Sequence, residues 1–376
     1  MKVRAAVLRQ GGKREPYADT LPLEIEDVIL TPPGPGEILV RILAAGLCHS
    51  DLSVINGSRP RPLPMVLGHE AVGEISEIGA GVEGLAIGDR VVFTFVPACG
   101  HCEPCAVGRP ALCEPGAAAN AAGQLLGGKS HWHDSAGQLL NHHLGVSAFA
   151  EYVVASPRSV VKIDKDLPPE IAALFGCAVL TGVGAVVNTA RVSPGESVAI
   201  FGLGGVGMSA ILGARCSGAY PLIGVDVNDE RLAVALTLGA HYALNARSTT
   251  LLDDLRDLVR GGVHYAIESA GNEAVLRQAY AATRRGGTTI TIGLPSPDTS
   301  FKIPAVSLVA EERTVKGSYM GSAVPKRDLP RFIALYRAGL LPVDRLLTHR
   351  ISLEDLNVGF DRLALGQAIR QVVICT

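Results

Sequence analysis

The chain has 376 residues, a length that predicts two or more domains, or one large one. Its 34 Lys and Arg residues against 36 Asp and Glu residues give a formal net charge of -2, so the composition excludes the strongly basic surface that binds nucleic acid. With 48% hydrophobic residues, and with too few glycines and prolines for low complexity, the chain is not expected to be disordered or fibrous.

The N-terminal residues lack the apolar segment and the small-residue cleavage site of a signal peptide, which favours a cytoplasmic, reducing location. In such a location, clustered cysteines are more often metal ligands than disulfides. Two uncharged runs, at 171–190 and 197–214, are long enough to cross a bilayer. Because several glycines interrupt both runs, we expect buried elements of a soluble α/β core and no membrane partner.

The first third of the chain predicts short strands separated by turns, because β-branched or alternating runs lie between Gly and Pro clusters. These runs are 2–8, 38–44, 71–78, 90–95 and 150–154. Their spacing predicts an antiparallel, barrel-like or sandwich domain. Residues 116–145 are rich in Ala, Gly and His. The four histidines could be metal ligands, but their spacing matches no metal template, which favours a long surface loop or an excursion between strands.

From about Pro168 onward, helical and strand patterns alternate, which predicts a parallel, doubly wound sheet. The predicted helices are 171–190, 206–216 and 230–238, and the predicted strands are 197–201, 221–227, 265–269 and 288–293. The tail predicts one helix with an apolar stripe after Lys326, a second around 353–365, and a closing strand at 371–375.

Four of the eight cysteines lie within fifteen positions, in the pattern Cys99-x2-Cys102-x2-Cys105-x7-Cys113. Thiolates this close in sequence can surround one ion, and Zn²⁺ prefers tetrahedral sulfur at closed structural sites. Two disulfides or unligated thiols are the alternative. The spacing favours a structural zinc that stiffens a loop and leaves no position open for a substrate.

A second set of candidate ligands is spread more widely and comprises Cys48, His69 and Cys177. Alone, a buried cysteine is usually a small hydrophobic residue, and a lone histidine is usually a hydrogen-bonded core residue. Together, two cysteines and one histidine match a catalytic zinc site whose fourth position stays open for water or substrate. Asp51 is placed to accept a hydrogen bond from His69 and orient it. Glu70 is placed to approach the metal from behind.

A glycine-rich turn between a predicted strand and a predicted helix contains Gly202, Gly204, Gly205, Val206 and Gly207. In that context, glycines allow the tight turn and let backbone amides reach a pyrophosphate at a helix N-terminus. Asp226 ends the next predicted strand, where a carboxylate accepts the ribose hydroxyls and repels a 2′-phosphate. The carboxylate favours NAD over NADP, although Arg231 nearby could weaken that preference. A site for S-adenosylmethionine on a similar sheet is the less favoured alternative.

These three sets of residues together closely resemble the zinc-dependent medium-chain alcohol dehydrogenases, in the long-form branch with a structural zinc lobe. The match runs along nearly the whole chain. Besides the lobe and the dinucleotide glycines, its motifs are Gly68-His69-Glu70, Gly88-Asp89-Arg90, Phe149-Ala150-Glu151-Tyr152, Cys177-x3-Thr181-Gly182 and Lys316-Gly317-Ser318.

The resemblance implies a GroES-like, mostly β catalytic domain at 1–178 and 322–376, with a Rossmann NAD-binding domain inserted at 179–321. It also implies two zinc ions per chain. The catalytic ion is expected at Cys48, His69 and Cys177 with Glu70 beside it, and the structural ion is expected in the four-cysteine lobe.

The resemblance further implies roles around the reacting atoms. Ser50 is expected to carry the alcohol proton outward, and Thr181 to flank the nicotinamide. Arg370 is expected to meet the pyrophosphate, and His49 stands where the family often has a cationic phosphate contact. Ile292 completes the expected cofactor set, and the expected substrate pocket comprises Phe95, Leu294, Tyr319 and Met320.

The implied activity is reversible hydride transfer between NAD and a primary, bulky or aromatic alcohol/aldehyde pair. A thiol-dependent formaldehyde dehydrogenase that uses glutathione or mycothiol stays open as an alternative, and Arg59 could contact an acidic substrate tail. A more distant alternative is a metal- and nucleotide-binding sensor without turnover. A polyol dehydrogenase is disfavoured, because that branch usually has Glu where this chain has Cys177.

Two further features follow from the resemblance. Many alcohol-oxidising members have a proton-relaying histidine where this chain has Ser53. The apolar, alternating segment 301–309 lies where relatives pair edge strands, which predicts a homodimer or homotetramer. A buried strand at the end of the sheet is the alternative for that segment.

Overall fold

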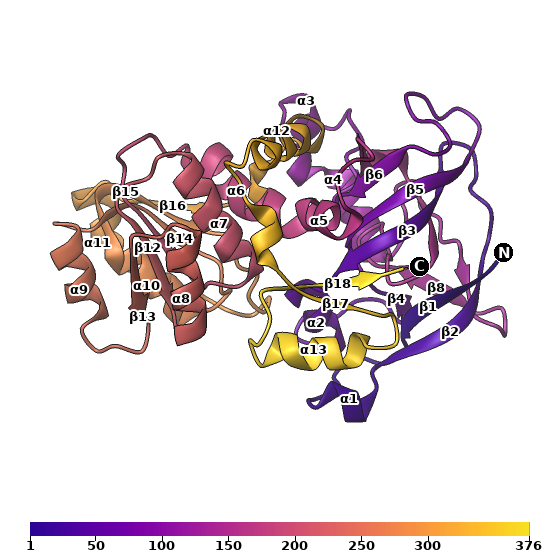
Figure 1. Cartoon of the computed structure of the whole chain (residues 1–376), viewed down its shortest axis with the longest axis horizontal. Helices are drawn as coiled ribbons and strands as arrows, with labels where there is room; N and C mark the ends of the chain where they lie inside the picture. Colours follow the sequence, from indigo (N-terminus) through magenta and orange to yellow (C-terminus); the bar gives the residue numbers. More distant parts are fainter. Residues whose placement is uncertain (376) are drawn as a thin grey trace. The chain divides into compact units, whose positions relative to one another are not determined.

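The computed structural model describes residues 1–375, which fall into two compact units. The first unit comprises Met1–Cys177, Val324–Arg331 and the chain from Leu347 onward, and the second comprises Ala178–Ala323 and Phe332–Leu346. Helices and strands are labelled in Figure 1. The domain limits expected from the sequence stay a prediction.

The first unit contains a small closed barrel with the strand order β1-β2-β7-β8-β4. These strands are β1 (Lys2–Leu8), β2 (Leu23–Leu30), β4 (Met65–Val66), β7 (Trp132–His133) and β8 (Leu139–His142). Strands β1 and β2 pair antiparallel along their whole length, and β4 pairs parallel with β8. The sequence patterns predicted β1 but missed β2, β4, β7 and β8.

The segment 116–145 is not the surface loop that its composition suggested. It contains most of helix α4 (Glu114–Ala122) and both strands that close the barrel, and Trp132 is fully buried. Three of its histidines, His131, His142 and His143, are also buried. The sequence showed no alternation of apolar and polar residues in this segment, because β7 and β8 are only two and four residues long.

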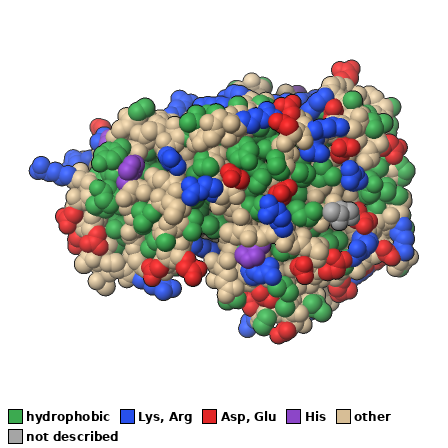
Figure 2. Space-filling model, viewed as in Figure 1, with side chains coloured by type: hydrophobic (Ala, Val, Ile, Leu, Met, Phe, Trp, Pro, Cys, Tyr) green, Lys and Arg blue, Asp and Glu red, His purple; other side chains and the backbone are tan. Residues whose placement is uncertain are grey.

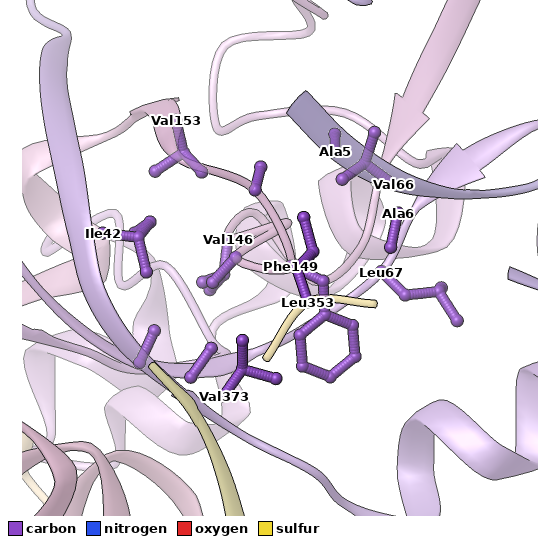
Figure 3. Packing of buried hydrophobic residues seen from close by; sticks show 14 of the residues in the cluster. Ala5, Ala6, Ile42, Val66, Leu67, Val146, Phe149, Val153, Leu353 and Val373 are labelled. Atoms are coloured by element: carbon purple, nitrogen blue, oxygen red, sulfur yellow. The ribbon is translucent and has the colours of Figure 1, made fainter. Parts of the chain in front are cut away.

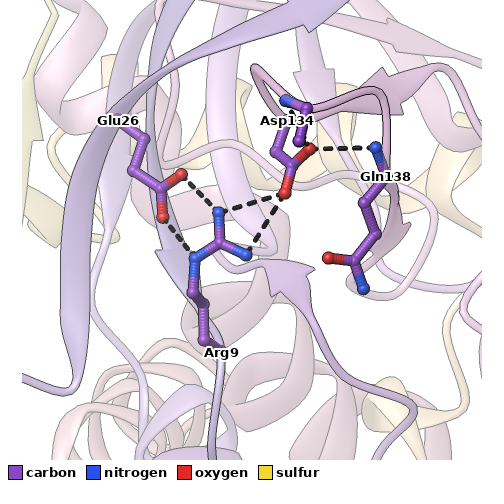
Figure 4. Close-up of polar contacts among 5 residues, drawn as sticks. Arg9, Glu26, Asp134 and Gln138 are labelled. Atoms are coloured by element: carbon purple, nitrogen blue, oxygen red, sulfur yellow. Dashed lines mark hydrogen bonds and ion pairs between the residues drawn. The ribbon is translucent and has the colours of Figure 1, made fainter.

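An ion-pair network ties the barrel strands to the turn that joins β7 and β8. Arg9 follows β1 and contacts Glu26 of β2 through two hydrogen bonds of 2.9 and 2.7 Å. The same guanidinium lies 3.3 Å from Asp134, whose other carboxylate oxygen accepts the amide of Gln138 (Figure 4). The bidentate geometry therefore fixes the hairpin against β2.

The second sheet of this unit has the order β10-β6-β5-β3-β18-β17, with β9 paired to β3. Its strands are β3 (Ile38–Gly46), β5 (Glu70–Ile78), β6 (Arg90–Phe93), β9 (Tyr152–Ala155), β10 (Val160–Ile163), β17 (Leu347–Ile351) and β18 (Arg370–Ile374). The C-terminal β18 pairs with β3, so both ends of the chain build the sheet. Accompanying helices are α1 (Tyr17–Thr20), α2 (His49–Ile55), α3 (Glu103–Ala106), α5 (Pro169–Leu174) and α13 (Leu356–Ala364). Helix α12 (Pro325–Arg337) begins in this unit, and its residues from Phe332 onward belong to the second.

The core of the first unit joins segments that are far apart in sequence. Leu67, Phe149 and Val373 belong to one buried cluster, and Figure 3 shows the Phe149 ring beside Val373. Full burial of a phenylalanine side chain stabilises a fold by about 1.5–3 kcal/mol. Phe149 therefore anchors the chain just after β8, next to the residues that precede β5.

The second unit is built on a six-stranded parallel sheet with the order β13-β12-β11-β14-β15-β16. Its strands are β11 (Val198–Phe201), β12 (Leu222–Asp226), β13 (Tyr242–Asn245), β14 (Val263–Glu268), β15 (Thr283–Thr291) and β16 (Thr314–Gly317). The helices are α6 (Leu180–Gly184), α7 (Gly205–Cys216), α8 (Asp229–Leu238), α9 (Leu251–Leu258), α10 (Glu273–Ala282) and α11 (Ala305–Ala310). This confirms the predicted doubly wound α/β class, whose strand order reverses between β11 and β14.

The segment 301–309 is neither an edge strand nor a buried strand. Residues 301–304 have no regular structure, and α11 follows them with Val306 and Val309 exposed. The strand at the edge of the sheet is β16 instead. Alternation of apolar residues predicted a strand here, but Pro304 fits the N-terminal boundary of a helix equally well.

One helical stretch, Pro169–Ala190, is long and apolar enough to cross a membrane by length and composition. The residues of its most apolar window are 89% buried inside the protein, as in the core helix of a soluble protein. It is interrupted by two π-helical turns, Phe175–Val179 and Ala185–Ala190.

Figure 2 shows basic and acidic side chains interspersed on the visible face, in keeping with the near-neutral charge.

Candidate active site

Three predicted metal ligands meet in the first unit. Cys48 precedes α2, His69 precedes β5, and Cys177 lies in the π-helical turn after α5. Their ligand atoms all lie within 4.8 Å of one another, with 3.5 Å between Cys177 Sγ and His69 Nε2, and all three side chains are buried. Two thiols and an imidazole are the donor set of a zinc site with an open fourth position, so these residues fit the expected ion.

The electrostatics of this cluster favour a deprotonated thiol. The Cys177 thiol beside Cys48 holds the pKa of Cys48 well below its usual value, and the same contact raises the pKa of Cys177. Burial would lower the pKa of His69, but the charges of Asp51 and Cys48 outweigh burial and raise it to about 10. A metal ion binding here would displace these protons.

Asp51 lies behind His69, as the sequence predicted. Its fully buried carboxylate is 3.1 Å from His69 Nδ1 and accepts the amide of Gly68 at 3.1 Å. Because Nδ1 donates to Asp51, Nε2 is left to face the two cysteines. Burial opposes ionisation of Asp51, but His69 and His143 lower its pKa. His143 was missed by the sequence reasoning, since only its place after β8 brings it here.

Glu70 and Arg370 form a buried pair beside this cluster. Glu70 is the first residue of β5 and Arg370 the first of β18. Glu70 is not among the three residues whose ligand atoms converge. A contact of Glu70 with the metal and of Arg370 with a pyrophosphate therefore stay predictions.

The four cysteines of the lobe also converge. The thiols of Cys99, Cys102, Cys105 and Cys113 all lie within 4.8 Å of one another. Backbone amides of Cys99 and Gly116 donate to Cys113 Sγ at 3.2 and 3.4 Å. The backbone amides of His101 and Cys102 lower the pKa of Cys99 to about 6, whereas burial raises the pKa of Cys105 to about 12. All eight cysteines are free thiols, and four donors with no open position fit a structural zinc.

The predicted nucleotide turn joins β11 to α7 in the second unit. Gly202 has a φ of 88°, and a Cβ on Gly207 would lie 1.9 Å from the Gly202 carbonyl oxygen, so both positions require glycine. Gly204 and Gly205 stand at the start of α7, followed by Val206. The turn therefore presents a helix N-terminus with no side chain in the way at Gly204.

Asp226 ends β12, the neighbour of β11, and is buried. Its two carboxylate oxygens accept the amides of Leu203 and Asn228, at 2.5 and 2.9 Å. Arg231 lies in the first turn of α8, where its amide is 3.2 Å from the side-chain oxygen of Asn228. Ile292 follows β15 and is 9% exposed. These placements fit a nucleotide site at the carboxyl ends of the strands.

Comparisons with known proteins agree with this geometry. The chain matches the alcohol dehydrogenase GroES-like domain at 34–165 and the zinc-binding dehydrogenase model at 205–338. It is 35% identical to S-(hydroxymethyl)glutathione dehydrogenase of Paracoccus denitrificans, over 100% of both chains. It is 37% identical to geraniol dehydrogenase of Castellaniella defragrans, over 100% of this chain and 98% of that protein. The solved benzyl alcohol dehydrogenase of Acinetobacter calcoaceticus has a TM-score of 0.93 at 31% identity, over 100% of both chains.

The chain belongs to the zinc-dependent medium-chain alcohol dehydrogenase family. It is therefore an oxidoreductase, and the resemblance inferred from the sequence is confirmed. Zinc and a nicotinamide nucleotide are the cofactors expected of such a dehydrogenase.

The helix after Cys48 carries the hydroxyl that the family resemblance singled out. Ser50 is half-buried in the first turn of α2, and the preceding His49 is exposed. Ser53 donates its hydroxyl to the His49 carbonyl at 2.8 Å, so it is engaged with its own helix. The role of Ser50 in proton transfer stays a prediction.

Replacing Ser53 by His is expected to change the pH dependence of alcohol oxidation. The new imidazole would titrate near pH ~6.5 and add a proton acceptor on the exposed side of α2. We expect faster turnover above that pH and a new inflection in the pH-rate curve. A curve that superimposes on that of the unsubstituted dehydrogenase would contradict the relay.

Of the residues expected in the substrate pocket, Phe95 belongs to the first unit and the others to the second, as does Thr181, which is expected to flank the nicotinamide. Phe95 is buried in the first unit, where its ring meets the His69 ring edge-on at 5.7 Å. In the second unit, Thr181 and Met320 are buried, Tyr319 is half-buried and Leu294 is 45% exposed. Phe95 thus lies beside His69, and the roles of all these residues stay predictions.

Proposed function

We propose that this dehydrogenase interconverts a primary alcohol and its aldehyde, with NAD as the hydride acceptor and donor. The observation that carries this proposal is the convergence of Cys48, His69 and Cys177 on one point. A closed set of four ligands would only stabilise the fold, whereas three donors leave a coordination position for a substrate oxygen.

In the proposed reaction, Cys48, His69 and Cys177 hold the catalytic zinc, and the four-cysteine lobe holds the structural zinc. When bound, zinc supplies Lewis acidity toward the alcohol oxygen, and the nicotinamide supplies the hydride acceptor. Ser50 accepts the hydroxyl proton and passes it along the exposed end of α2. Asp51 keeps His69 in the tautomer that presents Nε2, and Phe95 excludes water beside it.

NAD is proposed in preference to NADP because of Asp226. Its buried carboxylate stands at the end of β12, where a 2′-phosphate would meet a negative charge and a ribose 2′-hydroxyl would find an acceptor. Arg231 stands near it and could relieve some of that repulsion. We therefore expect faster turnover with NAD than with NADP, and slow turnover with NADP is compatible with the proposal.

The substrate class follows from what the relatives share. S-(hydroxymethyl)glutathione, geraniol and benzyl alcohol, which name three similar dehydrogenases, all carry a terminal hydroxymethyl group. Two of these compounds are bulky and apolar, which fits the aromatic neighbour of His69. We therefore propose a bulky or aromatic primary alcohol, with the thiol adduct of formaldehyde as the second candidate.

A single assay separates these candidates. Reduction of NAD and of NADP is followed at 340 nm with benzyl alcohol, geraniol, ethanol, and formaldehyde with and without glutathione or mycothiol. We expect turnover with the bulky alcohols and NAD. Strict dependence on a thiol would favour the formaldehyde dehydrogenase, and binding of NAD without any turnover would favour a sensor.

We propose a cytoplasmic homodimer or homotetramer. The support is the exposed apolar surface of the second unit, where Val306 is 72% and Val309 is 82% exposed on α11, the helix that precedes the edge strand β16 in the chain. Exposed apolar side chains next to a strand edge are typical of subunit contacts.

A further inference from the structure

We propose that His143 is a positioning residue of the metal site, which shares the carboxylate of Asp51 with His69 and so fixes the orientation of that metal ligand. The inference rests on the proposed zinc site. The juxtaposition itself is a feature of this chain: Asp51, His69 and His143 form a buried triad whose polar atoms lie within 4.8 Å of one another.

The carboxylate of Asp51 is crowded by three nitrogen atoms. Its Oδ1 lies 3.0 Å from His143 Nδ1, 3.1 Å from His69 Nδ1 and 3.1 Å from the Gly68 amide. Asp51 is fully buried, and a buried carboxylate is stable only when polar groups compensate its charge. The second imidazole lies close enough to form an ion pair with this carboxylate, although His143 Nδ1 has no hydrogen-bond partner of regular geometry.

The backbone of the segment after β8 is built to hold His143 there. Leu144 and Ser147 both have positive φ values, 54° and 58°, which non-glycine residues adopt only when their surroundings impose it. The Ser147 hydroxyl accepts the His143 amide at 2.8 Å. The turn is anchored at its far end, because the Ala148 amide donates to the Gly68 carbonyl at 2.9 Å.

The same contacts couple this turn to the metal ligand. Gly68 is the residue before His69, and it binds both Asp51 through its amide and the turn through its carbonyl. The rings of His143 and His69 meet edge-on, with centroids 5.4 Å apart. Val146 and Phe149, which flank this anchor, point into the hydrophobic core (Figure 3). His143 thus contacts Asp51 and His69 from a rigid support.

His142 is a natural internal control. It is also fully buried and adjacent in sequence, but it packs against Trp132, with ring centroids 6.1 Å apart. Among the described residues, its ring nitrogens have no hydrogen-bond partner. Replacing the His142 imidazole by a phenyl ring changes buried packing but removes no contact with Asp51.

The test measures zinc affinity by competition with a chromophoric chelator in the full chain. Replacing His143 by Phe leaves Asp51 without one partner, and we expect the affinity of the three-donor site to fall about 10–100-fold, while the lobe keeps its zinc. His143→Asn retains an N–H donor near the position of Nδ1 and should recover most of that loss. The visible spectrum of the cobalt-substituted site should shift for Phe and return for Asn.

His142→Phe should leave both the affinity and the cobalt spectrum unchanged. The proposal is overturned if His143→Phe, or His143→Leu where the Phe variant does not fold, binds zinc with the affinity and the cobalt spectrum of the unsubstituted protein. Equal losses in the His142 and His143 variants would also overturn it, since they would report packing alone. Failure of the proposed function is separable, because a chain without alcohol turnover would still show these shifts in metal binding.

Discussion

Replacing Cys177 by Ser is expected to reduce the zinc content from about two ions per chain to about one. Cys177 supplies one of three converging donors, whereas the lobe cysteines belong to another site and keep their ion. Alcohol oxidation should fall at least ~10³-fold, because Lewis-acid stabilisation worth several kcal/mol is lost and each 1.36 kcal/mol changes a rate about tenfold. Metal analysis and the 340 nm assay measure both effects.

Cys216→Ser is the matched control for this substitution. Cys216 is a half-buried thiol at the end of α7. It belongs neither to the four-cysteine lobe nor to the three-donor site. We expect its variant to retain both zinc ions and normal turnover. Two zinc ions and undiminished turnover in the Cys177 variant would refute the assignment of the catalytic site.

Ser50→Ala is expected to lower the turnover number of alcohol oxidation by about 10²–10⁴-fold, the contribution of a positioned acid-base group. Zinc content and NAD affinity should remain unchanged, since the hydroxyl is neither a metal donor nor part of the nucleotide turn. Steady-state kinetics together with a binding titration of NAD would separate these quantities.

Ser53→Ala provides the control on the same helix. Its hydroxyl is bound to the His49 carbonyl, so its removal is expected to leave turnover within about twofold while costing a fraction of the stability of α2. If Ser50→Ala also retained normal turnover, the proton would have to leave by another path, and Ser50 would drop out of the mechanism.

Part of the site could be predicted from the sequence because ligands that are close in sequence are also close in the folded chain. The lobe cysteines lie within fifteen residues, so their convergence needs only one loop. Cys48, His69 and Cys177 are distant in sequence, and here the residue types indicated the set and the family resemblance supported it. The glycines of the nucleotide turn were readable because a positive φ at Gly202 and a close approach at Gly207 admit no other residue.

What could not be predicted depends on long-range packing. The strands β7 and β8 are too short to show a period, so the segment between 116 and 145 resembled a loop. Once those strands close the barrel, His143 is carried to Asp51, more than ninety residues away in sequence. Conversely, the segment 301–309 was expected to form a strand, but it contains helix α11. Alternation of apolar residues along one segment does not show whether another strand lies beside it.

The short distances between the thiols of the lobe also make this site sensitive to oxidation once its zinc is lost. With zinc absent, Cys102 and Cys113 have their sulfur atoms only 3.9 Å apart, and Cys99 is a reactive thiolate near neutral pH because its pKa is lowered to about 6. A dissolved oxidant would convert such neighbours into a disulfide and release two protons, which prevents zinc from returning. Loss of the structural ion should therefore become irreversible in air, and reactivation by added zinc should require a reductant.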